Sequence, residues 1–92
     1  MRYRNNYWYV SRKILSQIYT RELMLRDIRT LDYVQRALGT VSLKDVKDAC
    51  GLSYKQAIES LARLEYFGDI AHRQVSKWNG QHYIYPHEFW AA

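Results

Sequence analysis

The chain has 92 residues, enough for one domain with one modest hydrophobic core. Its hydrophobic share of 48% excludes a disordered chain, and no apolar run is long enough to span a membrane. The net charge of +5 and the pI near 9.5 favour a polyanionic partner such as nucleic acid.

The cysteine content and the first residues bear on the compartment. Cys50 is the only cysteine, so an internal disulfide is impossible and a reducing compartment is favoured. Residues 1–10 are basic and aromatic, and they lack the apolar stretch of a secretory signal. We therefore expect a cytoplasmic protein.

Residues 1–20 are predicted to form an N-terminal extension with a helix that begins after Ser11. Arg2 and Arg4 precede this helix, either as a basic arm that enters a minor groove or as a flexible terminus. The helix carries more apolar surface than a small core covers, which favours a homodimer interface, unless it folds back on its own monomer. The interface residues would be Val10, Ile14, Leu15 and Ile18.

A second helix is predicted to end at Gly39 and to pack beneath the elements that follow. Thr20 can cap this helix separately, or the two helical runs can form one continuous helix. The side expected to face the core carries Leu25, Ile28, Leu31, Val34 and Leu38.

The centre of the chain predicts two capped helices joined by a tight turn. Ser42 is a suitable N-cap, and Asp45 follows it at the spacing of a capping box. Gly51 is expected to end the first helix in the left-handed conformation, and Leu52 to fill the turn. Ser53 then caps the second helix, and two helices joined in this way form a helix-turn-helix.

The second helix of this unit has an apolar face and a polar face. Gln and Arg side chains can read adenine and guanine edges, so the polar face is either a DNA-reading surface or a solvated one. Glu59 opposes phosphates unless it accepts from cytosine or pairs with Lys55 or Arg63, one helical turn away. The major-groove candidates are Ser53, Lys55, Gln56, Glu59, Ser60 and Arg63.

Residues 70–85 predict a two-stranded β-hairpin around a two-residue Asn79–Gly80 turn. Trp78 at its tip either contacts a sugar or the minor groove, or packs on the body or a cross-strand partner. Pro86 is expected to end the last strand, and residues 86–92 to dock as a tail on the core or on a second subunit. The candidates for backbone contacts are Lys44, Lys47, Arg73, Ser76, Lys77, Trp78 and Asn79.

The pattern L-S-x-x-x-A-x-x-x-L-x-x-L-E-x-x-G-x-I, which runs from Leu52 to Ile70, resembles the recognition-helix signature of winged-helix regulators. With the following A-H-R … N-G … Y-I-Y, residues 42–85 are similar to the FaeA-like fimbrial-regulator and MarR-type families. The resemblance implies an α+β fold: a mostly helical winged helix-turn-helix with a C-terminal two-stranded wing, here preceded by an extra N-terminal helix. The wing departs from many relatives because it is short and ends in an aromatic residue.

We therefore predict a single domain over residues 1–92, with a winged-helix core at 21–85. The predicted function is sequence-specific binding of double-stranded DNA, by a small homodimeric transcription regulator that acts by occupancy. Stand-alone winged helices of this kind are frequent in phage, plasmid and archaeal-virus genomes, which is an expectation from the resemblance. The alternative is a winged-helix module that binds another protein and does not read DNA.

Catalytic and metal chemistry is not predicted. Cys50, His72, His82 and His87 lack the spacing of a structural zinc site, although His72 and His82 can approach each other across the hairpin. Cys50 lies on the apolar side of its helix, as an inert core thiol would. We expect no enzyme activity, no cofactor and no small-molecule substrate.

Overall fold

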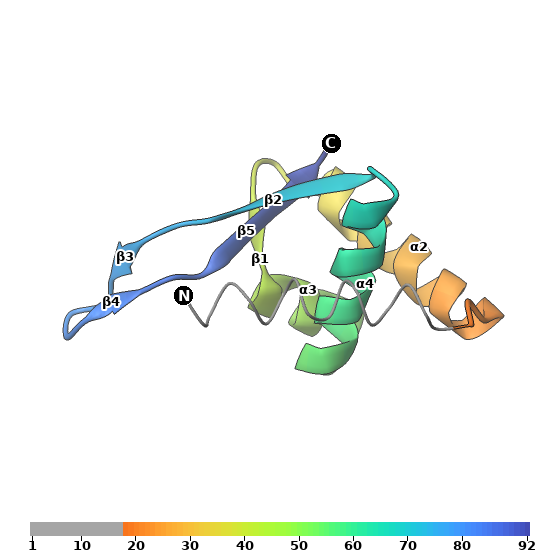
Figure 1. Ribbon diagram of the computed structural model, residues 1–92, viewed down its shortest axis with the longest axis horizontal. Helices are drawn as coiled ribbons and strands as arrows, with labels where there is room; N and C mark the ends of the chain where they lie inside the picture. Colours follow the sequence, from red (N-terminus) through yellow and green to blue (C-terminus); the bar gives the residue numbers. More distant parts are fainter. Residues whose placement is uncertain (1–17) are drawn as a thin grey trace.

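A computed structural model describes residues 18–92 of the chain, and within them it has an α+β fold (Figure 1). Three helices, α2 (Arg21–Arg36), α3 (Leu43–Cys50) and α4 (Tyr54–Tyr66), pack against one another and against a small antiparallel sheet. No helix in this range combines the length and the apolar character needed to cross a bilayer.

The sheet has three strands in the order β1-β5-β2. Its strands are β1 (Val41–Ser42), β2 (Ile70–Gln74) and β5 (His87–Ala91), while β3 (Lys77–Trp78) and β4 (Tyr83–Ile84) form a separate two-stranded ladder. Figure 1 shows this ladder projecting from the helices at the end of the long hairpin that joins β2 to β5.

The local signals for α3 and α4 are confirmed. The Ser42 hydroxyl accepts from the backbone N–H of Asp45, and the Asp45 carboxylate accepts from the backbone N–H of Ser42, both at 3.0 Å. Gly51 ends α3 with φ at 64°, the left-handed conformation that glycine adopts without a steric cost. Ser53 caps α4, and with Gln56 it forms a second capping box.

Helix α2 begins separately at a cap on Thr20, which was one of the two predicted alternatives. The Thr20 hydroxyl accepts from the backbone N–H of Leu23 at 3.2 Å, so α2 starts with its own cap and does not continue an earlier helix. At its other end α2 stops at Arg36, two residues before the predicted end, and Leu38 is fully exposed.

The predicted core face of α2 is confirmed in part, because Val34 is buried and Leu31 packs against the core. Leu25 and Ile28, also expected in the core, are 52% and 57% exposed. Asp27 and Thr30 are buried beside Val34 in their place. The apolar spacing failed at Leu25 and Ile28 because two polar side chains on this helix find partners inside the protein.

The predicted tail is the central strand of the sheet. Strand β5 pairs with both β1 and β2, so that Phe89 lies opposite Val41 on one side and His72 on the other. Phe89 is 1% exposed. Pro86 separates β4 from β5 and does not end the sheet, so the predicted core boundary at residue 85 falls too early.

The hairpin turn also differs from the prediction. Trp78 pairs with Tyr83, which leaves a four-residue loop and not a two-residue Asn79–Gly80 turn. The Asn79 side chain accepts from the backbone N–H groups of Gln81 and His82, both at 2.9 Å. The backbone N–H of Asn79 also donates to the carbonyl oxygen of His82 at 3.1 Å, so the loop is closed by backbone and side chain together, with Gly80 and Gln81 at its centre.

The core fills the space between the helices and the inner face of the sheet. Its buried apolar residues come from every helix and from three strands. They are Val34, Val41, Val46, Cys50, Ala57, Leu61, Ala62, Leu64, Ile70 and Phe89.

His87 on β5 lies against this core and is sensitive to pH. Its ring centroid is 5.0 Å from that of His72, and His72 contacts Glu65 on α4. Burial lowers the pKa of His87, the neighbouring His72 lowers it further, and Glu65 opposes the shift. The folded chain therefore favours a neutral His87.

Acidification is expected to destabilise the fold through His87. In the unfolded chain this histidine takes up a proton near pH 6.5, whereas the folded chain resists protonation to a lower pH. The unfolded state then binds more protons below about pH 6.5, so the free energy of unfolding falls as the pH drops through that range. Thermal melts at about pH 7.5 and about pH 5.5 should show a lower Tm in acid.

His87→Gln should reduce this acid shift, while His82→Gln, at an exposed loop position, should keep it in full. An unchanged acid shift in His87→Gln would mean that another group controls the pH dependence.

Candidate nucleic-acid interface

A buried polar cluster joins α2 to α4. Arg63 donates to both carboxylate oxygens of Asp27, from Nε at 2.7 Å and from Nη2 at 2.9 Å. Ser60 donates to Asp27 Oδ1 at 2.6 Å, and its Oγ lies 3.1 Å from Thr30 Oγ1. Tyr19 donates to Asp27 Oδ2 at 3.0 Å. The Asp27 charge is thus neutralised and hydrogen-bonded within the protein, as a buried carboxylate requires.

Two of the predicted major-groove residues belong to this cluster and cannot reach DNA. Ser60 is fully buried and Arg63 is 3% exposed. Their spacing on α4 looked like a polar surface because a sequence pattern does not show that Asp27 lies opposite them. The signal was on α2, where Asp27, Thr30 and Val34 recur at helical spacing on one face.

Four of the other five arginines in residues 18–92 have a hydrogen-bond or ion-pair partner in the chain, and Arg21 has no acidic partner there. Arg26 and Arg36 pair with Glu22 and Asp32 along α2 at 3.3 Å and 2.9 Å. Further contacts are made by Arg29, which donates to the backbone carbonyl of Cys50, and by Arg73, which pairs with Glu88 on β5.

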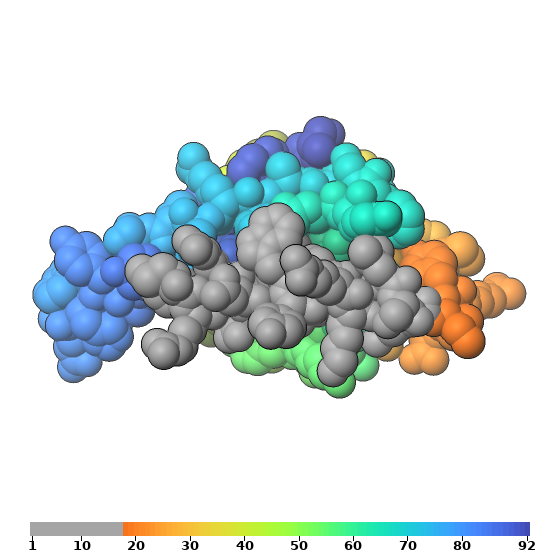
Figure 2. All heavy atoms as spheres, viewed as in Figure 1, coloured from red at the N-terminus to blue at the C-terminus, as the bar shows by residue number. Residues whose placement is uncertain are grey.

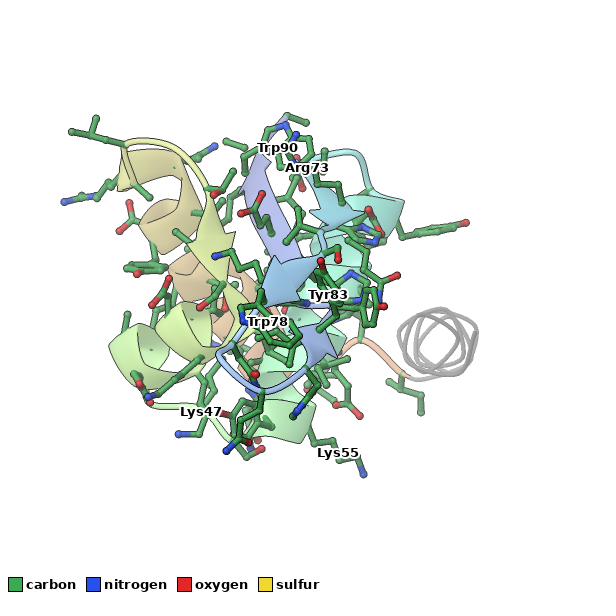
Figure 3. The ribbon with its side chains drawn as sticks, turned by 90° about the vertical axis from the view of Figure 1, so that its left-hand side faces the viewer. Lys47, Lys55, Arg73, Trp78, Tyr83 and Trp90 are labelled. Carbon is green, nitrogen blue, oxygen red and sulfur yellow. The ribbon has the colours of Figure 1, made fainter. Side chains whose placement is uncertain are left out.

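Arg73 is also placed away from the predicted DNA-binding side. Its guanidinium lies over the Trp90 ring, 6.0 Å from the centroid, on the sheet face that does not pack on the helices. Figure 3 shows Arg73 and Trp90 together at the top of the view, with Lys47 and Lys55 at the bottom. Arg73 thus lies apart from Lys47 and Lys55 in this view, and its guanidinium already pairs with Glu88.

The lysines are arranged differently from the arginines. Residues 18–92 contain four, and they lie on α3, on the first turn of α4 and on the projecting hairpin. Within this range no acidic side chain pairs with Lys44, Lys55 or Lys77. These three ammonium groups leave uncompensated positive charge on α3, α4 and the hairpin.

Lys47 links the first two of these elements. Its Nζ lies 3.0 Å from Asp48 Oδ1 and 5.1 Å from the centroid of the Tyr54 ring. The hydrogen bond to Asp48 and the charge of that carboxylate raise the pKa of Lys47. Lys44, three residues earlier, is a neighbour on the same helix surface.

Helix α4 is exposed in its first turn and at its last residue, Tyr66. Lys55 is exposed, whereas Ser53 and Gln56 use their side-chain oxygens in the capping box, which leaves the Gln56 amide N–H groups available. Glu59 is half-buried, and neither Lys55 nor Arg63 pairs with it in the described residues. The expected alternative, in which Glu59 forms an ion pair with Lys55 or Arg63 along α4, is therefore wrong.

The tip of the hairpin, residues 75–86, presents aromatic rings to solvent. Trp78 and Tyr83 are each 60% exposed and stack edge to face with centroids 5.3 Å apart. Trp78 thus packs on a cross-strand partner, Tyr83, as one alternative predicted. Most of its ring surface is still exposed to solvent. Ser76 and Asn79 are exposed, and Asn79 holds the loop. Figure 2 shows this tip as a projection at the left end of the molecule.

Several predicted positions lie outside the described residues. They are Arg2, Arg4, Val10, Ile14 and Leu15. Ile18, the last of the predicted dimer residues, is 86% exposed and precedes α2.

Of the residues considered for metal binding, His72 and His87 lie together with ring centroids 5.0 Å apart, whereas His82 lies in the hairpin loop. Cys50 is 3% exposed, and burial raises its thiol pKa, as expected for a core cysteine. Within residues 18–92, no three His, Cys, Asp or Glu side chains are grouped as metal ligands.

The candidate interface is thus the lysine-bearing surface of α3, the first turn of α4 and the hairpin tip. It is defined by side-chain geometry and charge alone. Comparisons with protein-family models, with curated proteins and with solved structures find no match to this chain.

Proposed function

We propose that this chain binds double-stranded DNA as a winged helix-turn-helix, with α3 and α4 as the helix-turn-helix and residues 75–86 as the wing. The observation that carries the proposal is the set of three lysines on α3, α4 and the hairpin that have no acidic partner among the described residues. They are Lys44, Lys55 and Lys77, whereas Arg63 and Arg73 pair with carboxylates. Unpaired ammonium groups on one helix-turn-helix and one hairpin suit the evenly charged backbone of a duplex.

The burial of Ser60 and Arg63 limits how such a protein reads sequence. The second half of α4 belongs to the core, so base contacts come from its first turn, where Lys55 and the Gln56 amide are accessible. The N-terminal residues of a recognition helix are also those that usually meet base edges. We infer that phosphate contacts supply most of the affinity and that a short stretch of bases supplies the specificity.

We propose that this chain of 92 residues regulates by occupying its DNA site. The bound protein then blocks or assists another DNA-binding protein. Selection of binding sites from a randomised duplex pool tests the specificity. Enrichment of a short motif supports a sequence-specific regulator. If the chain binds duplexes but no motif is enriched, it contacts phosphates without reading bases, and the proposed sequence specificity is wrong.

Trp78→Ala is expected to weaken duplex binding about five- to tenfold, which corresponds to ~1–1.4 kcal/mol. The exposed ring would lose its contact with a sugar or with the minor groove. Tyr66→Ala is the matched control, because Tyr66 is also 60% exposed but lies at the far end of α4. Equal losses in the two variants would remove the wing from the interface.

Glu59 supports a second candidate, a module that binds a basic surface of another protein. This carboxylate is unpaired within the described residues and lies next to the accessible turn of α4. If DNA is the partner, Glu59→Gln should strengthen duplex binding severalfold, because it removes a negative charge near phosphates. If a protein is the partner, the same variant should leave the chain without DNA affinity and should weaken capture of that protein.

A further inference from the structure

Helix α2 presents an apolar stripe on the side that faces away from the core. Leu25 and Ile28 are 52% and 57% exposed, and they lie opposite the buried face of Asp27, Thr30 and Val34. Figure 1 places α2 at the end of the molecule opposite the projecting hairpin. The stripe is therefore remote from the hairpin, while Leu25 at its edge lines a pocket that also contains Gln56 of α4.

Charged residues bound this stripe along the helix. Arg21 lies one turn before Leu25, and Asp32 lies one turn after Ile28. Arg21 is exposed and has no acidic partner among the described residues, and Asp32 is exposed and shares its carboxylate with Arg36 at 2.9 Å. We call Arg21, Leu25, Ile28 and Asp32 the α2 outer face.

We propose that the α2 outer face is the contact surface between two copies of this chain, with the two α2 helices packed antiparallel about a two-fold axis. If the axis passes midway between Leu25 and Ile28, each Leu25 meets an Ile28 of the other copy. The same operation brings each Arg21 to an Asp32 of the other copy. One two-fold axis thus buries the apolar residues and pairs the charges at both ends, as a self-complementary interface requires.

This pairing is the reason to choose a second copy as the occupant. The stripe has opposite charges at equal distances from its centre, Arg21 on one side and Asp32 on the other. A two-fold axis through that centre therefore places each charge beside the opposite charge of the second copy. A single pair of helices buries less surface than the roughly 1,200–2,000 Å² of stable interfaces. We therefore expect reversible dimers that dissociate in the micromolar range.

A charge swap between two variants tests the proposal. Arg21→Asp places two acidic pairs in the homodimer, and Asp32→Arg places two basic pairs, so each variant alone should dimerise at least ~10-fold more weakly than the natural chain. In a mixture, one chain carries two aspartates and the other two arginines, so both ends of the heterodimer are attractive. Mixing the two variants should restore dimerisation.

Sedimentation velocity of the full chain over a range of concentrations, without DNA, provides the measurement. It is independent of the proposed function, because a chain that fails to bind DNA can still dimerise and the reverse also holds. Arg73→Asp, an equal charge change on the sheet, is the control that should dimerise as the natural chain does.

Three results would overturn the proposal. The first is a natural chain that stays monomeric at the highest concentration measured, as it would if its own N-terminal residues covered the stripe. The second is a single variant that dimerises like the natural chain, which would place the interface elsewhere. The third is a mixture that dimerises no better than its components, which would remove the Arg21–Asp32 pairing.

Discussion

Replacing Arg63 with alanine is expected to destabilise the fold by about 3–5 kcal/mol. The substitution leaves the Asp27 carboxylate buried without its one cationic partner among residues 18–92, because Ser60 and Tyr19 supply hydrogen bonds but no charge. In a domain of this size that loss is a large share of the whole stability. Urea denaturation followed by circular dichroism measures it directly.

Two comparisons make this result specific. Arg36→Ala breaks an exposed pair at the surface of α2 and should cost no more than about 0.5 kcal/mol. The double variant Asp27→Leu with Arg63→Met removes both buried charges and should recover most of the stability, because apolar replacements of buried ion pairs are often neutral. If Arg63→Ala instead folds normally and loses DNA affinity, Arg63 belongs to the groove surface after all.

Neutralising two unpaired lysines should weaken duplex binding about 60-fold at ~0.1 M salt. Each lysine that contacts a phosphate contributes about 0.9 to the slope of the logarithm of affinity against the logarithm of salt concentration. Lys55→Gln with Lys77→Gln should therefore lower that slope by about 1.8. Fluorescence anisotropy of a labelled duplex at several salt concentrations gives both quantities.

The matched control removes the same charge from another part of the molecule. Arg36→Gln with Arg73→Gln also lowers the net charge by two, but both guanidinium groups already pair with carboxylates of their own chain. This variant should keep nearly the full affinity and salt slope. If both double variants weaken binding equally, net charge alone drives the association and the lysine surface is not an interface.

The elements with local signals were predictable from the sequence. Helices α3 and α4, their caps and the turn between them depend on residues within four positions of each other, such as Ser42 with Asp45 and the φ of Gly51. The positions of the lysines followed from the same elements. The separate start of α2 at Thr20 was one of two open alternatives and needed the cap geometry to decide.

The features that depend on distant partners were not predictable in the same way. Asp27 and Arg63 are 36 residues apart, so neither the burial of Arg63 nor the polar core face of α2 could be read from helical spacing. Strand β5 pairs with β1, which lies more than forty residues earlier in the sequence. Because Pro86 precedes β5, the sequence predicted a tail at this position and not a strand. Two of the six expected groove residues, Ser60 and Arg63, lie inside the fold, where Asp27 is their partner.

The central claim is tested most directly by titrating a labelled mixed-sequence duplex with the full chain at roughly 50 and 200 mM salt. The account predicts micromolar binding at the lower salt that weakens by at least tenfold at the higher one, because phosphate contacts release counterions. Absence of binding at the lower salt would contradict the account and would favour the protein-binding module.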